Sequence, residues 1–435
     1  MRRLLGLILL VALGSCSGGQ ERGEGLYIQR FFGECTREFG TTTDIAAATG
    51  ECGIVTTMIN AFRAAHPETR VSQNVVAWPG YSQLTSQIAA RQPPDLVTMH
   101  AGIIPDYAGK GLIEPVEPYL AAAGLAPAAF TPAARQGVTW RGRMYGLPWD
   151  THGGLWHVNK ALFAKAGLMR GDRPILPTSP AELLAHGRQF RERTGKPYLI
   201  QSLVGDPAGA ARTLYTYMLA QGAPIFPTPR RIALETPEGL RVANLFRQVT
   251  AQGIGTSDMD TPAAIAAFMN GEGGVYPTGT WMIGQFETEA ATAGRPLHRS
   301  YGVYPFPALY GAPVMFVSGH AWVVPRRDRT PAQRQSIADF FRFMAARNGD
   351  WARTGHLPAM QAVIDGAAFK SLPHRRDIAP VATTGRSLPD GVMRQVAVEG
   401  LVGEEMAAAM TGQKPVAQAL RDAERRVNEF LGEVE

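Results

Sequence analysis

From residue 26 onward, short apolar runs alternate with stretches whose apolar residues recur at helical spacing. One such stretch contains Ile54, Met58 and Phe62, which fall at i, i+4 and i+8. A second helical stripe follows at 81–91. Both stretches are typical of helices. The apolar runs, typical of strands, lie at 26–32, 70–77 and 95–99. This βαβαβ order predicts a parallel sheet covered by helices on both faces.

Ligands of such sheets bind beyond the carboxyl ends of the strands. In this chain those ends carry aromatic, carboxylate and imidazole groups, namely Phe32, Glu34, Trp78 and His100. We therefore take these four residues as candidate ligand contacts. Two alternatives stay open: a tryptophan is often a core residue, and Glu34 beside Cys35 could simply point to solvent.

The alternation continues to the C-terminus, interrupted by two proline-rich extended segments at 115–132 and 301–309. We interpret these segments as passages between two lobes. The predicted N-terminal lobe comprises 26–118 and 302–346, and the predicted C-terminal lobe comprises 119–301 and 347–435. Later helices with apolar stripes are predicted around 242–249, 263–270, 337–344 and 416–431, and later strands at 274–278 and 318–324.

The stretch 144–168 combines a strand, a turn at Pro148, and a glycine pair before a second strand. This pattern predicts a loop that displays Trp149 and Asp150 between two strands. A ring of this kind can stack on a sugar, and a carboxylate accepts paired hydroxyl hydrogen bonds. Asn159 is a suitable N-cap for the next helix, which should end at Gly167. The plain alternative is a buried strand–turn–strand with a polar tip.

The first residues are typical of an export signal. Arg2 and Arg3 precede an apolar segment at 4–13 that is too short to span a bilayer. Leu13-Gly14-Ser15-Cys16 is similar to a bacterial lipobox, which implies cleavage before Cys16, lipidation of its sulfur and a flexible tether at 17–25. A plain signal peptide is the alternative. The expected location is the periplasm or the outer face of the cell membrane, with a lipid anchor.

Two of the three cysteines, Cys35 and Cys52, remain after lipidation. An exported chain permits a disulfide between them, and free thiols are the alternative. We expect no metal site, because no neighbouring ligands complete a set, and because His152 and His157 lie five apart, which is poor spacing for two ligands on one element.

The charge pattern does not indicate nucleic-acid binding. The formal net charge is +6, from 43 basic and 37 acidic residues, but the basic residues are scattered in short clusters. The hydrophobic share of 45% and the length of 435 residues fit an ordinary globular protein with two cores.

Five segments together resemble the family-1 extracellular solute-binding proteins, the maltose-binding-like receptors of ABC sugar importers. They are PPDLVTMHAGIIPDYAGKGLIEPVE, MYGLPWDTHGGLWHVNKALFAKAGL, AAFMNGEGGVYPTGTWMIGQF, SGHAWVVPRRDRTPAQRQSIADFFRFM and TGHLPAMQAVI. The resemblance covers nearly the whole mature chain. It implies an α/β fold of two lobes, the type II periplasmic-binding-protein fold, joined by strands that cross twice and closing around ligand by a hinge.

By motif position the resemblance implies a set of ligand contacts: Trp78, His100, Trp149, Asp150 and Trp281, with Phe32, Glu34, Ser318 and His320 facing the same cleft. It also implies a monomer that carries no cofactor, binds a sugar and docks on permease subunits of an ABC transporter.

Two other functions stay open. A receptor for a polyol or a polyamine is possible, although polyamine sites need several carboxylates among aromatic rings. A secreted glycosidase would need two carboxylates across one bond, for which Asp150 and Glu34 are the candidates. The chain contains no nucleophile elbow, Walker A or zinc-protease sequence, so we expect a binding protein and not an enzyme.

Overall fold

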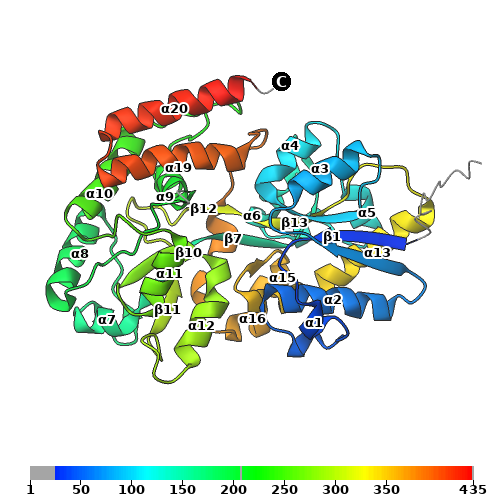
Figure 1. Ribbon diagram of the computed structural model, residues 1–435, viewed down its shortest axis with the longest axis horizontal. Helices are drawn as coiled ribbons and strands as arrows, with labels where there is room; N and C mark the ends of the chain where they lie inside the picture. The colour runs from blue at the N-terminus through cyan, green and yellow to red at the C-terminus, as the bar shows by residue number, and fades with distance from the viewer. Residues whose placement is uncertain (1–24, 206–207, 434–435) are drawn as a thin grey trace, which may run out of the picture.

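The computed structural model describes residues 25–205 and 208–433, and the expected signal peptide, Cys16 and most of the tether lie outside them. The chain forms two α/β lobes that lie side by side (Figure 1). The N-terminal lobe contains a five-stranded sheet in the order β2-β1-β3-β13-β6. Its strands are β1 (Gly25–Arg30), β2 (Arg70–Val75), β3 (Leu96–His100), β6 (Leu147–Pro148) and β13 (His320–Val323).

The first half of this sheet is the parallel βαβαβ unit that the sequence predicts, since β1 pairs in parallel with both β2 and β3. Ile54, Met58 and Phe62 are buried on one face of the long helix between β1 and β2. The helices before the first passage between lobes are α1 (Thr36–Phe39), α2 (Gly50–Ala65), α3 (Tyr81–Ala89), α4 (Ile104–Ala108), α5 (Glu117–Ala122) and α6 (Pro132–Gly137).

The C-terminal lobe is built around one long strand, β7 (Asp150–Asn159). In its sheet β10, β7, β12 and β15 follow one another, and β11 and β14 also pair with β7. The bounds of these partners are β10 (Val275–Gly279), β11 (Tyr301–Tyr304), β12 (Met315–Ser318), β14 (Leu357–Pro358) and β15 (Gly385–Arg386). Two-stranded pairs are formed by β4 (Thr139–Trp140) with β5 (Arg143–Met144), and by β8 (Met169–Arg170) with β9 (Arg173–Pro174).

Helices surround this second sheet, and α19 and α20 cover one side of the lobe (Figure 1). The remaining helices are α7 (Lys160–Lys165), α8 (Pro180–Thr194), α9 (Ala208–Ala220), α10 (Pro237–Ala251), α11 (Thr261–Met269), α12 (Ile283–Ala291), α13 (Pro331–Ala346), α14 (Asn348–Trp351), α15 (Gln361–Asp365), α16 (Ala367–Ser371), α17 (Arg375–Ile378), α18 (Val381–Thr384), α19 (Gln395–Thr411) and α20 (Val416–Gly432).

The buried apolar side chains form two separate cores, one in each lobe. Tyr119, Phe130 and Leu147 belong to the N-terminal core, so the chain first leaves that lobe at Trp149, between β6 and β7. It returns at Gly319, between β12 and β13. Both passages lie later than the boundaries expected after 118 and after 301. The proline-rich segments that suggested those boundaries are connections within a lobe.

The two passages are made by strands that run side by side in opposite directions. In the N-terminal lobe β13 pairs antiparallel with β6, and in the C-terminal lobe β12 pairs antiparallel with β7. We call the region where these strands pass from one lobe to the other the junction. The strands come close at Gly319, where a Cβ atom would clash with the backbone oxygen of Asp150. A third passage follows α13 and runs through α14 and the turn Ala352–Thr354 to β14.

The expected loop at 149–154 does not form, because β7 is a continuous ten-residue strand from Asp150 to Asn159. Its two glycines serve close packing. A Cβ on Gly153 would lie 3.0 Å from a Val317 methyl, and one on Gly154 would lie 2.9 Å from the Phe306 ring. The predicted start and end of the helix that follows are confirmed. The Asn159 side chain accepts from Leu162 N at 3.1 Å as the N-cap, and Gly167 after the helix has φ +72°.

The predicted disulfide is confirmed, because Cys35 and Cys52 are bonded with their Cα atoms 6.1 Å apart. The bond ties the segment after β1 to the first turn of α2. Closing a loop of 17 residues restricts the unfolded chain and stabilises the fold by about 3 kcal/mol.

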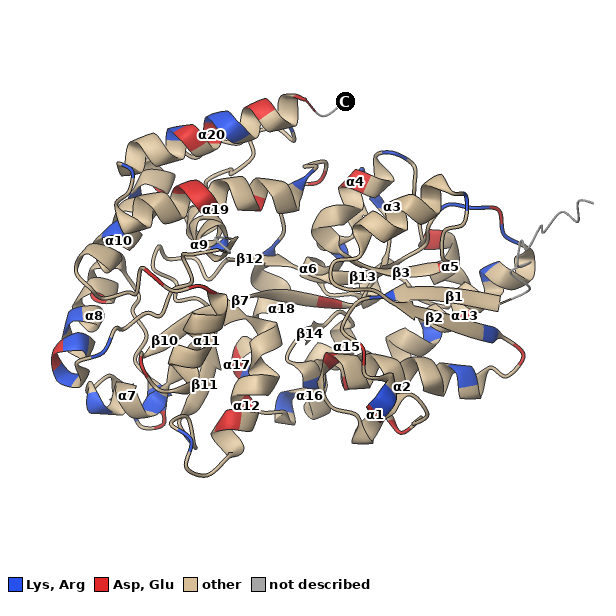
Figure 2. Cartoon of the chain, viewed as in Figure 1, with Lys and Arg blue, Asp and Glu red and all other residues tan. Residues whose placement is uncertain are grey.

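Among the described residues, no helix is both long enough and apolar enough to cross a membrane. Acidic and basic residues are mixed along the same surface helices, as Figure 2 shows for α20. This mixture agrees with the scattered charge seen in the sequence.

Candidate functional site

Two tryptophan rings are exposed at the junction and come from opposite lobes. Trp78 follows β2 in the N-terminal lobe and is 67% exposed, and Trp281 follows β10 in the C-terminal lobe and is 40% exposed. Each meets a histidine edge to face, Trp78 with His100 and Trp281 with His152, both at 5.7 Å between ring centroids. The two histidine rings are themselves 5.7 Å apart. The tryptophans therefore flank a set of histidines on either side.

Two more histidines, His320 and His356, and the carboxylate of Asp150 lie beside His100 and His152. We name these five residues the junction cluster; it comprises Asp150, His100, His152, His320 and His356. Three of its members form a hydrogen-bonded chain. Asp150 Oδ2 lies 2.9 Å from His320 Nδ1, His320 Nε2 lies 3.1 Å from His100 Nε2, and His100 Nδ1 lies 2.9 Å from the Tyr81 hydroxyl. An ionised carboxylate can only accept, so His320 Nδ1 donates to it. His320 Nε2 then accepts from His100 Nε2–H, and His100 Nδ1 accepts from Tyr81.

Asp150 is 1% exposed and is saturated by protein donors. Besides the imidazole it accepts from the backbone N of His320 at 3.0 Å and from Trp351 Nε1 at 2.8 Å. Burial alone would raise the pKa of Asp150, but His320 and His356 outweigh it and hold the pKa below its ordinary value. The carboxylate thus positions His320 and Trp351, and both of its oxygens are bonded to protein donors.

His356 links the two lobes at the third passage. Its Nε2 lies 2.6 Å from Glu51 on α2, and its Nδ1 lies 3.0 Å from the Thr280 hydroxyl, which precedes Trp281. Burial lowers the pKa of His356, but the two carboxylates of Asp150 and Glu51 raise it by more. The net shift of the His356 pKa is therefore upward. The Glu51 pKa is lowered, since the bond to His356 outweighs burial. Together they form an ion pair between the N-terminal lobe and the passage.

His100 and His152 are held neutral. Burial is the main cause that lowers the pKa of each well below 6.5, and the neighbouring His320 adds to it. His152 differs from the other members because its Nε2 is buried without a hydrogen-bond partner.

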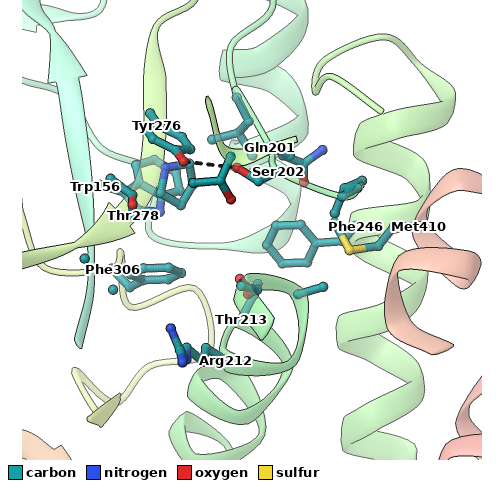
Figure 3. A pocket seen from close by; sticks show the side chains of 18 of the residues that line it. Trp156, Gln201, Ser202, Arg212, Thr213, Phe246, Tyr276, Thr278, Phe306 and Met410 are labelled. Atoms are coloured by element: carbon teal, nitrogen blue, oxygen red, sulfur yellow. Dashed lines mark hydrogen bonds between the residues drawn. The ribbon is translucent and has the colours of Figure 1, made fainter. Parts of the chain in front are cut away.

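A cavity of about 180 Å³ opens in the C-terminal lobe beside Trp281 (Figure 3). Rings of Trp156, Tyr276 and Phe306 line it together with the polar side chains of Gln201, Ser202, Arg212 and Thr278. Ser202 Oγ and the Tyr276 hydroxyl are 3.0 Å apart, and Arg212 donates from Nε to Glu399 at 2.8 Å. Trp281, Gly154 and Arg212 also line a smaller hollow that reaches His152 and Ser318, so the cavity extends toward the junction cluster.

The structure brings together some of the residues expected at the site. Trp78, His100 and Trp281 lie at the junction with exposed or half-buried rings, and Ser318 lines the smaller hollow. His320 is buried within the junction cluster.

Three other expected contacts are buried in the core or bonded locally. Trp149 is 1% exposed in the N-terminal core, where its ring packs on Trp322 and Trp351. Phe32 is buried against His320 and Trp351 at 5.0 Å. Glu34 is exposed and accepts from Thr36 N at 2.6 Å, just before α1. Two of the three are thus buried in the N-terminal core, and the third is exposed and bonded to its own segment.

Sequence reasoning missed the residues that complete the site. Glu51, Tyr81, Arg212, Trp351 and His356 stand in helices or after turns, where no strand-end rule identifies them. His356 lies within TGHLPAMQAVI, one of the five segments that carry the family resemblance, and that segment was the signal that pointed to it. His152 was set aside by its spacing from His157. His157 lies apart from the cluster, with Nδ1 2.8 Å from the Tyr301 hydroxyl, whereas the partners of His152 come from other strands.

Two α/β lobes joined by paired crossing strands, with aromatic rings from both lobes at the junction, define a two-lobe binding protein of type II. The chain belongs to the bacterial extracellular solute-binding proteins, whose family model matches residues 53–349. This family consists of binding proteins and not of enzymes, as the sequence led us to expect.

A binding protein of Brucella abortus strain 2308 is 26% identical over 255 residues, which are 57% of this chain and 58% of that protein. The match thus spans less than two thirds of the relative. The fold is shared with solved structures over 94% of this chain and 98% of theirs. One is the sugar-binding protein of Xanthomonas citri (TM-score 0.79, 16% identity), and another is the cyclic alpha-maltosyl-1,6-maltose binding protein of Arthrobacter globiformis (TM-score 0.73, 20% identity).

Proposed function

We propose that this protein is the substrate-binding component of an ABC transporter, which captures a mono- or oligosaccharide between its lobes and delivers it to a membrane permease. The observation that carries the proposal is the pair of exposed rings, Trp78 and Trp281, that face the junction from opposite lobes. Indole faces cover the C–H faces of pyranoses with little loss of side-chain entropy. The sugars named for the proteins of similar fold support the same ligand class.

The cavity beside Trp281 supports a polyhydroxylated ligand over a polyamine. Its polar side chains are an amide, hydroxyls and a guanidinium, which bond to hydroxyl groups and carry no negative charge. Asp150 and Glu51, two carboxylates at the junction, are already bonded to histidines. The glycosidase alternative has no support either, since Asp150 is sealed in the junction cluster and Glu34 is turned to solvent.

A thermal-shift screen of sugars, polyols and spermidine on the purified chain tests this function. A ligand at about 100 times its dissociation constant stabilises the folded state by roughly 2.7 kcal/mol. We expect at least one sugar to raise the melting temperature and to be recovered chemically unaltered. A shift with spermidine and none with any sugar would reject a sugar receptor, and hydrolysis of a glycoside would favour the enzyme.

We further propose that the protein acts as a monomer, held at the membrane by a lipid on Cys16 and with its lobes divided at the two strand passages and at the third passage after α13. The support is the lipobox-like sequence and the extracellular setting of the family. Cys16→Ser removes the acceptor sulfur, so we expect the protein to leave the membrane fraction. Membrane fractionation that does not change in this variant would count against the anchor.

A further inference from the structure

Three imidazoles of the junction cluster converge although they come from three separate elements. His100 ends β3, His152 lies in β7 and His320 begins β13. One ring nitrogen of each lies within 4.8 Å of the other two. The centroids of His320 and the other two rings are 4.5 and 4.7 Å apart.

We propose that His100, His152 and His320 form a three-histidine site for a divalent first-row transition ion, with Zn²⁺ as the ion that this ligand set suits best. Tetrahedral Zn²⁺ with bonds of about 2.0–2.1 Å separates its ligand nitrogens by roughly 3.3 Å. His100 Nε2 and His320 Nε2 are 3.1 Å apart, close to that spacing. His152 offers the third nitrogen, within 4.8 Å of the other two.

The unpartnered nitrogen of His152 is an independent observation that points to a ligand. Its Nε2 is buried and makes no hydrogen bond in the described structure, while the side chain is more than nine-tenths buried. A buried polar atom is normally paired, because leaving it unpaired forfeits its bond to water. The hydrogen-bonded chain through His100 and His320 gives this nitrogen no partner, whereas a metal bond would.

The groups behind the ligands are those that histidine metal sites use. Such ligands bond through their second nitrogen to a carboxylate or another oxygen, which orients the ring. Asp150 holds His320 Nδ1, and the Tyr81 hydroxyl contacts His100 Nδ1. On binding, the His100 proton moves from Nε2 to Nδ1 and Tyr81 becomes its acceptor. Asp150 also places one negative charge beside the cation, and imidazoles bind metal in their neutral form.

A second grouping, of Asp150, His320 and His356, fits a metal less well. Both ring nitrogens of His356 are occupied, by Glu51 and by Thr280, and His320 Nδ1 is already bonded to Asp150. An ion from solvent also has access to the three-histidine set, since His100 is its least buried member and touches the exposed ring of Trp78. Three protein ligands leave one coordination position for water or an oxygen of a bound molecule.

The test is a titration of the chelator-treated full mature chain with Zn²⁺ by calorimetry and with Co²⁺ by visible absorption, without sugar. We expect one ion per chain and the intense absorption of tetrahedral Co²⁺. His152→Asn should weaken binding by more than about 100-fold, since even the loss of a group behind a ligand costs 10–100-fold. Tyr81→Phe, which removes such a group, should fall in that lower range.

His298→Asn is the matched control, because it removes a partly exposed imidazole outside the cluster and should leave the affinity unchanged. Wild-type protein that binds no ion, or binds Co²⁺ with an octahedral spectrum, would overturn the proposal. So would unchanged binding in folded His152→Asn. If that variant does not fold, the wild-type stoichiometry and Co²⁺ spectrum decide alone. A negative sugar screen leaves this result untouched.

Discussion

Replacing Trp281 by alanine is expected to weaken sugar binding by about 2–4 kcal/mol, as truncation of a central aromatic contact does. Trp281 lies in the turn Thr280–Met282 directly after β10, between the cavity of the C-terminal lobe and His152. Gly279 permits this placement, because a Cβ there would clash with the indole. Since the ring is 40% exposed, its loss should cost less stability than the roughly 3–5 kcal/mol of a core tryptophan. Titration calorimetry and thermal melts of the same sample measure both effects.

Trp140→Ala is the matched control for this experiment. Trp140 is also a half-buried tryptophan, but it packs on Tyr145 and Arg141 and lines neither the cavity beside Trp281 nor the smaller hollow at His152. Its removal should leave sugar affinity unchanged. An intact affinity in Trp281→Ala together with a collapsed melting temperature would show that Trp281 supports the core and does not contact ligand.

Asp150→Ala is expected to lower the free energy of unfolding by about 3–5 kcal/mol, the cost of breaking a buried ion-paired network from one side. The change leaves three donors without an acceptor, namely the backbone N–H and Nδ1–H of His320 and the indole N–H of Trp351. Asp150→Asn should cost less, since one acceptor oxygen remains. Urea unfolding in the presence of a chelator measures the difference without any contribution from metal.

The control is Asp339→Ala, which breaks an exposed pair with Arg342 on α13. Such surface pairs contribute about 0–1 kcal/mol. If Asp150→Ala unfolds no more easily than this control, the carboxylate does not hold the junction together. From sequence alone we expected Asp150 to bond ligand hydroxyls, whereas here any loss of affinity would arise from misplaced rings.

The parts of the fold that local pattern determines could be predicted from the sequence. Helical stripes located α2, α10, α13 and α20, and the strand ends brought Trp78 and His100 to the junction. Trp281 could be placed because a strand, a glycine and a turn precede it. Each of these predictions depends on residues within a few positions of one another.

The remaining parts depend on which distant segments meet. Gly153 and Gly154 suggest a turn, but they are glycines because Val317 and Phe306 pack against them. Trp149 and Trp281 are the same residue type and each follows a strand, yet one is core and the other exposed, because only the first meets Trp322 and Trp351. No spacing rule could join His100, His152 and His320, since their convergence arises from the pairing of β3, β13, β12 and β7.

The position of β13 bears on how the chain acquires its structure during synthesis and export. In the N-terminal sheet β13 lies between β3 and β6, and β6 has no other partner strand in that sheet. Residues up to 148 therefore cannot complete this lobe until the segment 320–323 has been made, about three quarters of the way along the chain. Contacts so distant in sequence form slowly. A chain with this order of assembly therefore stays incomplete until most of its residues have been made.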